Sequence, residues 1–168
     1  MTTRRRFLAI SAAATAFPGI GVAQPVHTWK GIALGARATL RLAHPRAREI
    51  SERVASEISR LEDIFSLYRA NSAVSRLNAT GALTEPPFEL LACLSLASRV
   101  HGASGGRFDP TIQPLWARYA NAAIKGTTPD RETRDKALSL VGWHKVGINA
   151  GAVTLRPGMS LTLNGIAQ

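Results

Sequence analysis

Residues 145–163 read KVGINAGAVTLRPGMSLTL, and this segment settles the fold class. It contains three short runs typical of β-strands, Lys145–Ile148, Ala152–Leu155 and Ser160–Leu163. Turn residues separate the runs, at Asn149-Ala150-Gly151 and at Pro157-Gly158. Parallel strands need a crossover connection of a dozen or more residues, so turns this short predict antiparallel pairing. Strands that follow a series of helices indicate an α+β fold rather than regular βαβ units.

Three helical patterns lie upstream of these strands. The first opens at Pro45 and repeats apolar residues every three or four positions, at Ile50, Val54, Ile58, Leu61 and Phe65. The second runs from Phe88 to about His101 and stops at Gly105-Gly106. Its apolar side carries Leu90, Leu91, Leu94, Ala97 and Val100. The third has a cap and first turn at Thr128-Pro129, acidic residues at Asp130 and Glu132, and an end near Gly142.

The remaining segments complete a single domain. Residues 28–42 alternate apolar and polar side chains, which predicts a half-buried strand. Residues 66–85 are polar and predict an irregular connection. We therefore expect one α+β domain at residues 24–168, with amphipathic helices packed on mainly antiparallel strands. The last residues, LTLNGIAQ, read as a strand entering a turn, so we expect this domain to be incomplete at the C-terminus.

The chain has a formal net charge of +10 at pH 7, which raises the question of nucleic-acid binding. Three of the charges sit in the first six residues, and the others are scattered without interleaved aromatics. This pattern favours a solvated basic surface over a nucleic-acid groove. The single cysteine, Cys93, excludes an internal disulfide, and its apolar surroundings are typical of a small buried residue. No Cys/His spacing typical of zinc occurs.

Residues 1–23 have the features of an export signal. Arg4, Arg5 and Arg6 precede an apolar stretch too short to span a membrane, and small residues follow at 21–23. The order Thr3-Arg4-Arg5-Arg6-Phe7-Leu8 fits the twin-arginine pattern, and the stretch behind it is rich in alanine and poor in leucine. We expect a twin-arginine signal peptide and a periplasmic mature protein. The alternative is a basic amphipathic helix.

Three segments contain aromatic, glycine, proline and acidic residues in patterns that suit ligand binding as well as a purely structural role. In residues 65–78, Tyr68 offers a flat surface for stacking, although it could equally close a helix core. In residues 105–116, Gly105-Gly106 would let a ligand approach backbone amides. Pro110 holds Asp109 extended and fixes the direction of its carboxylate, but a helix stop followed by a rigid turn explains this pattern as well. In residues 163–168, a glycine turn at a helix start could present amides to phosphate.

The order and the amino-acid sequences of these segments resemble those of the ApbE family of flavin transferases, from about Trp29 to Gln168. The resemblance covers KGIALGA at 30–36, SLYRANS at 66–72, RLN at 76–78, GRFDPT at 106–111 with QPLW at 113–116, and LNGIAQ at 163–168. The Phe-Asp-Pro-Thr block is the most specific of these. The resemblance implies an enzyme that takes FAD and Mg²⁺, moves FMN to a Thr or Ser hydroxyl of a periplasmic or membrane-anchored acceptor flavoprotein, and releases AMP.

The resemblance also assigns site residues. Those that would contact FAD are Leu34, Tyr68, Arg107, Phe108, Asp109, Thr162 and Gln168. Gly165 would give its backbone carbonyl to the metal. Many members have Met at position 34, Asp at 162 and Lys at 168, so two charges near the cofactor differ. A subgroup associated with nitrous oxide reductase maturation resembles the LNGIAQ wording.

The family's other metal ligands fall beyond Gln168, which leaves two further readings open. The chain could be a flavin-binding module that holds FAD without transferring it, or a periplasmic scaffold. We expect residues 1–168 alone to be a poor catalyst, because diphosphate transfer depends on neutralisation of charge by the metal.

The signal sequence gives a first testable expectation. Replacing Arg4 and Arg5 together with lysine should block export, because the twin-arginine route reads these two side chains. Fractionation of periplasm and cytoplasm measures the effect, and a general secretory signal fused to residue 24 provides the control. Unchanged periplasmic accumulation of the double variant would remove the twin-arginine assignment.

Overall fold

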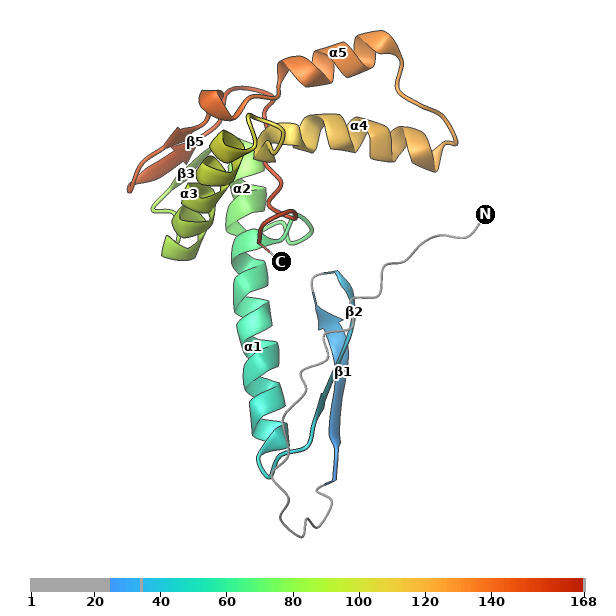
Figure 1. Ribbon diagram of the computed structural model, residues 1–168, viewed down its shortest axis with the longest axis vertical. Coiled ribbons are helices and arrows are strands. Elements are labelled where there is room, and N and C mark those ends of the chain that lie inside the picture. The colour runs from blue at the N-terminus through green and yellow to red at the C-terminus, as the bar shows by residue number, and fades with distance from the viewer. Residues whose placement is uncertain (1–24, 34, 168) are drawn as a thin grey trace.

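The computed structural model describes residues 25–33 and 35–167, and the predicted signal peptide at 1–23 lies outside them. A long helix, α1 (Ala47–Phe65), forms a shaft with a β-hairpin along one side (Figure 1). Helices α2 (Ala73–Thr80) and α3 (Phe88–Ala103) and a small sheet gather at the end of the shaft. Helices α4 (Gln113–Ile124) and α5 (Arg131–Ser139) lie side by side beyond them. The expected α+β mixture is confirmed.

The hairpin replaces the single strand expected at 28–42. Strands β1 (His27–Ala33) and β2 (Ala36–Leu42) pair antiparallel, with Trp29 opposite Leu40 and Ile32 opposite Arg37. The chain reverses at Gly35, whose φ of +72° suits glycine. Alternation continues through the reversal because both strands turn one face to α1. On that face the Trp29 ring lies over Gly31, where a Cβ atom would overlap the indole.

Helix α2 and strand β3 (Ala82–Thr84) occupy the connection that we expected to be irregular, so that prediction is wrong. The hydroxyl of Ser72 caps α2 by accepting a hydrogen bond from Ser75 N at 3.0 Å. Gly81 ends the helix in the left-handed conformation. Only eight residues separate these two signals, which is too short for an apolar period to stand out among polar neighbours.

The small sheet has the order β3-β5-β4, and both pairings are antiparallel as expected. Strands β4 (Gly147–Ile148) and β5 (Ala152–Thr154) match the first two runs of the sequence. The third run, Ser160–Leu163, is not a strand. The prediction of a third strand is therefore wrong, and Leu161 and Leu163 are instead buried in the core. Apolar contacts there outweigh strand pairing.

Helix α3 matches the second helical pattern, whereas α4 and α5 differ from what the sequence predicts. Helix α4 was not predicted; it follows a short 3₁₀ turn, Pro110–Ile112, in the segment for which a rigid turn was one of two interpretations. Helix α5 is capped by Asp130, which accepts from Thr133 N at 2.7 Å, rather than by Thr128. It ends at Ser139, three residues before the expected stop. None of the helices within 25–33 and 35–167 is long and apolar enough to cross a membrane.

The core joins segments that are far apart in sequence. Its largest fully buried members come from α2, α3, β5 and the segment after β5, and they are Val74, Leu77, Leu90, Leu94, Val153, Leu161 and Leu163. Asn78 holds the last segment in place through two hydrogen bonds. Its Nδ2 donates to Leu161 O at 2.9 Å, and its Oδ1 accepts from Leu161 N at 2.7 Å. One side chain thus satisfies both backbone groups of a buried residue.

These two bonds predict a stability effect. Asn78→Ala should lower the free energy of unfolding by about 1–3 kcal/mol, because it leaves the Leu161 amide and carbonyl without partners. Denaturant unfolding followed by circular dichroism measures the change. Asn121→Ala, at an exposed position of α4, is the matched control and should not destabilise the chain. An equally stable Asn78→Ala variant would contradict the assigned role.

Candidate functional site

Tyr68 lies in the loop after α1 and exposes 78% of its surface, so it does not close a helix core. The loop beneath it is fixed. Ser66 Oγ accepts hydrogen bonds from the amides of Tyr68 and Arg69, at 3.0 and 3.1 Å. Gly35 of the hairpin turn lies close to the ring, since a Cβ added there would be 3.5 Å from Tyr68 Cε2. The turn next to Leu34 therefore reaches the Tyr68 ring, although Leu34 itself is outside the described residues.

Arg69 ties the same loop back to α1. Its guanidinium is 2.6 Å from carboxylate oxygens of both Glu62 and Asp63, and it also donates to Ser59 O at 3.0 Å. The hydrogen bond that Arg69 donates to Asp63 and the negative charge of Glu62 raise the pKa of Arg69 above its ordinary value. Arg69 stays positively charged throughout the accessible pH range. The orientation of the loop thus comes from contacts made by its neighbours, and the Tyr68 ring remains available.

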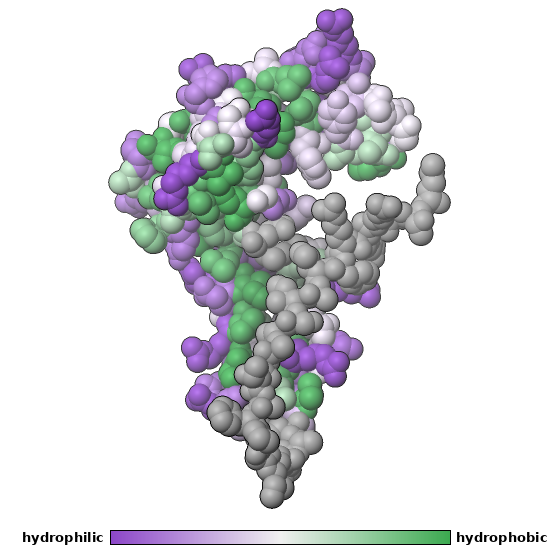
Figure 2. Space-filling model, viewed as in Figure 1, coloured by the Kyte–Doolittle hydropathy of each residue, from purple (hydrophilic) through white to green (hydrophobic). Residues whose placement is uncertain are grey.

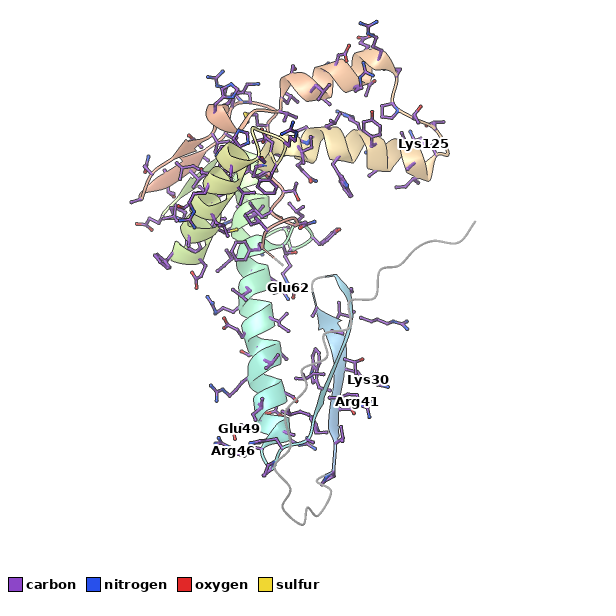
Figure 3. The ribbon with its side chains drawn as sticks, in the orientation of Figure 1. Lys30, Arg41, Arg46, Glu49, Glu62 and Lys125 are labelled. Atoms are coloured by element: carbon purple, nitrogen blue, oxygen red, sulfur yellow. The ribbon has the colours of Figure 1, made fainter. Side chains whose placement is uncertain are left out.

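A shallow cleft separates Tyr68 from the turn at residues 163–167. It is lined by Glu62, Phe65, Ser66, Leu67, Tyr68, Leu163, Asn164 and Ala167, and its volume is about 120 Å³. Figure 3 shows Glu62 at this end of α1. Pockets that enclose a ligand of drug size measure about 300–1,000 Å³. The cleft can therefore form one wall of a flavin site but does not enclose a flavin.

The glycine pair ahead of Phe108 makes a closed turn. Gly105 and Gly106 have φ values of +60° and +78°, and their amides donate to Gly102 O and His101 O. The Phe108 amide donates to Ser104 Oγ at 3.0 Å, and its carbonyl accepts from His101 Nδ1 at 2.8 Å. The amides that we expected to face a ligand are thus used inside the turn. The helix stop, which was the alternative interpretation, describes them correctly.

Asp109 is extended as expected, with φ −136° and ψ 111°, but its carboxylate turns into the fold. Oδ1 accepts from the amide and hydroxyl of Thr111 at 2.8 and 2.6 Å, and Oδ2 accepts from Trp143 N at 3.0 Å. The expected ligand-facing direction is not what the structure has. Pro110 restricts the backbone but leaves the side-chain torsions free, and the nearby amides decide them. Asp109 holds the site together from within.

The segments at 107–110 and 162–165 lie against each other. The ring of Phe108 faces Gly165, because a Cβ added to Gly165 would be 3.4 Å from Phe108 Cε2. The Thr162 amide donates to Pro110 O at 2.8 Å, and the side chain of Thr162 is partly buried. Arg107 stays exposed and donates only a long bond, 3.3 Å, to Ser104 O. The structure thus brings most of the predicted FAD contacts to one end of α1.

Gln168 and Gly165 are the two remaining predicted site residues. Gln168 lies outside the described residues. Gly165 is exposed in the 163–167 turn, where Leu163 O accepts from the amides of Ile166 and Ala167. Within the described residues, no group of three or more His, Cys, Asp or Glu side chains could hold a metal ion. Mg²⁺ demands near-octahedral oxygen ligation, and one carbonyl does not supply it. These residues do not by themselves fit a magnesium site.

Sequence reasoning missed several residues that shape the site. Ser66 and His101 orient the two loops, and Asn164 and Ala167 form the far wall of the cleft. A serine directly after a helix is a recognisable turn signal, so Ser66 could have been found. His101 had no such signal, because its partner is a backbone carbonyl seven residues away.

Comparison with curated proteins finds sequence similarity to FAD:protein FMN transferases. The chain is 30% identical over 98 residues to the FAD:protein FMN transferase of Chlamydia trachomatis, which covers 57% of this chain and 31% of that protein. It is 28% identical over 152 residues to the enzyme of the same name from Klebsiella pneumoniae, covering 85% of this chain and 46% of that protein. The chain therefore spans less than half the length of these relatives.

Solved structures share the fold. The ApbE protein of Thermotoga maritima is 22% identical, with a TM-score of 0.72 over 85% of this chain and 48% of that one. The apo flavinyl transferase ApbE of Pseudomonas stutzeri is also 22% identical, with a TM-score of 0.70 over the same shares. The ApbE family model matches residues 34–168, which is most of the sequence, and the chain belongs to the ApbE family.

Proposed function

We propose that this chain provides the flavin-facing wall of an FAD:protein FMN transferase. The observation that carries the proposal is the convergence of Tyr68, Phe108 and the 163–167 turn at one end of α1, although these residues come from segments up to 100 positions apart. An exposed aromatic ring on a braced loop suits stacking against an isoalloxazine. Its homologues in Chlamydia trachomatis and Klebsiella pneumoniae carry the name of this activity.

In the proposed reaction, a Thr or Ser hydroxyl oxygen of the acceptor protein attacks the phosphorus of the FMN half of FAD. The bond between this phosphorus and the bridging diphosphate oxygen breaks, AMP leaves with that oxygen, and the hydroxyl proton passes to solvent. The exposed guanidinium of Arg107 would attract the diphosphate. Tyr68 would hold the ring and Phe108 would fix the 163–167 turn against it.

Magnesium dependence belongs to the proposal for the whole enzyme, since the described residues offer only the Gly165 carbonyl. We further propose that the protein works in the periplasm after twin-arginine export, and that its acceptor is a periplasmic or membrane-anchored flavoprotein. The LNGIAQ wording at 163–168 favours the subgroup linked to nitrous oxide reductase maturation.

A second candidate is a module that binds a flavin nucleotide without transferring it. The lack of an acidic cluster that could hold the metal, among the described residues, favours this candidate for residues 1–168 taken alone. Binding of FAD without covalent labelling, in both the short chain and a lengthened one, would establish it.

The role of Tyr68 is tested by substitution. Tyr68→Ala should weaken FAD binding by about 1–3 kcal/mol. Alanine substitution of an aromatic residue that stacks on a nucleic-acid base costs a similar binding free energy. The melting temperature should hardly change, because the ring is 78% exposed. Tyr68→Phe keeps the stacking surface and should bind normally. Tyr119→Ala, which removes an exposed tyrosine of α4, is the matched control. An unchanged dissociation constant for Tyr68→Ala would remove this residue from the site.

The transfer itself is tested by chain length. Residues 24–168 should not label an acceptor covalently, whereas the same residues joined to the C-terminal half of the Klebsiella pneumoniae relative should do so with FAD and Mg²⁺. Flavin fluorescence of the acceptor on a denaturing gel gives the readout, and the intact relative is the positive control. Equal labelling by the short chain would show that the chemistry lies wholly within residues 24–168.

A further inference from the structure

Glu62 brings a carboxylate to the cleft beside Tyr68. Its side chain is one of those that line the cleft, yet only 11% of that side chain is exposed. Figure 2 shows hydrophobic surface over α3 and along the adjoining part of α1. Most of the other lining residues are apolar as well, namely Phe65, Leu67, Leu163 and Ala167. A carboxylate in such surroundings is costly unless hydrogen-bond donors reach its oxygens.

Arg69 is one such donor. Its Nη2 lies 2.6 Å from Glu62 Oε2, and its Nη1 lies 2.6 Å from Asp63 Oδ1. Two carboxylates therefore face one guanidinium, and these three side chains together carry one negative charge. A carboxylate has about four lone-pair sites, so Glu62 can accept a hydrogen bond from a ligand in the cleft while it stays paired with Arg69.

This negative charge decides which part of FAD the wall can accept. The diphosphate is anionic and is repelled by Glu62, so it must lie away from this end of the cleft. A group with an N–H donor is attracted instead, because a hydrogen bond to a carboxylate is stronger than one between neutral groups. The isoalloxazine has a single N–H, at N3 on its pyrimidine edge, and its opposite edge carries only methyl groups.

We propose that Glu62 is a specificity-determining residue that accepts a hydrogen bond from N3–H of the isoalloxazine. The ring would lie against Tyr68 with its pyrimidine edge toward α1 and its dimethylbenzene edge outward. The apolar neighbours of Glu62 strengthen such a bond, since competition from water is reduced. This inference rests on the proposed function, because it names the part of the flavin that the same cleft recognises.

The test compares FAD with 3-methyl-FAD, in which a methyl group replaces the hydrogen on N3. Isothermal titration calorimetry on the 168-residue chain gives both dissociation constants. The unsubstituted chain should bind 3-methyl-FAD at least about tenfold more weakly than FAD, because the charge-assisted hydrogen bond is lost. Glu62→Ala should weaken FAD binding by a similar factor. It should also bind the two ligands within about twofold of each other, since the residue and the N3 hydrogen act as one pair.

Asp63→Ala is the matched control. It removes the other carboxylate from the Arg69 guanidinium, but Asp63 does not line the cleft. This variant should therefore keep the preference for FAD over 3-methyl-FAD, which separates contact with the ligand from support of the loop. Glu62→Gln keeps the shape of the side chain and a neutral acceptor, so it guards against misfolding and should show an intermediate preference.

Equal binding of FAD and 3-methyl-FAD by the unsubstituted chain would overturn the inference and indicate that another donor, such as the adenine amino group, faces Glu62. A preference that Glu62→Ala retains in full would overturn it too. Either result leaves the proposed function in place as long as Tyr68→Ala weakens FAD binding. No binding of FAD at all, or binding that Tyr68→Ala leaves unchanged, counts against the proposed function itself.

Discussion

The carboxylate of Asp109 is the interaction on which the rest of the structure depends. It is largely buried, and both of its oxygens accept hydrogen bonds from residues on different segments. The Thr111 hydroxyl donates to it and accepts from Gly142 N at 2.7 Å, while Trp143 N donates directly. A buried carboxylate is costly unless its lone pairs are satisfied, so the turn after α3 and the loop after α5 must stay in register. Loss of that register would leave the charged carboxylate of Asp109 without hydrogen-bond donors.

From this point the arrangement extends to the cleft. Thr162 donates to the carbonyl next to Asp109, and Asn78 holds Leu161 from the opposite side. Residues 161–163 are thereby fixed in the core, and the chain leaves it as the exposed turn that faces Tyr68 across the cleft. The two walls are held differently: ion pairs to α1 hold the Tyr68 loop, and buried leucines hold the turn. A surface far from regular secondary structure can therefore have a defined shape.

The sequence predicted what depends on periodicity and left out what depends on particular partners. Helices α1 and α3 were predictable because their apolar residues recur over many positions, and the antiparallel sheet was predictable because short turns separate its strands. Helix α2 was not, since eight residues between Ser72 and Gly81 hold only two turns. At the candidate site, the sequence motifs pointed to Tyr68 and Phe108, whose role stays a prediction. The direction of the Asp109 carboxylate depends on an amide 34 residues away. Such neighbours, distant in sequence, set the side-chain torsion angles, and no local sequence pattern encodes these angles.

The bond between Asn78 and Leu161 also constrains how the protein can be made. It joins residues 83 positions apart, and the leucines that follow it complete a core begun by α2 and α3. Because synthesis proceeds from the N-terminus at roughly 5–20 residues per second, α2 and α3 leave the ribosome several seconds before their last packing partners. During that interval Leu77, Leu90 and Leu94 lack the side chains that bury them. This core can therefore close only after residues 161–163 have been synthesised, and until then the nascent chain presents its apolar surface to chaperones.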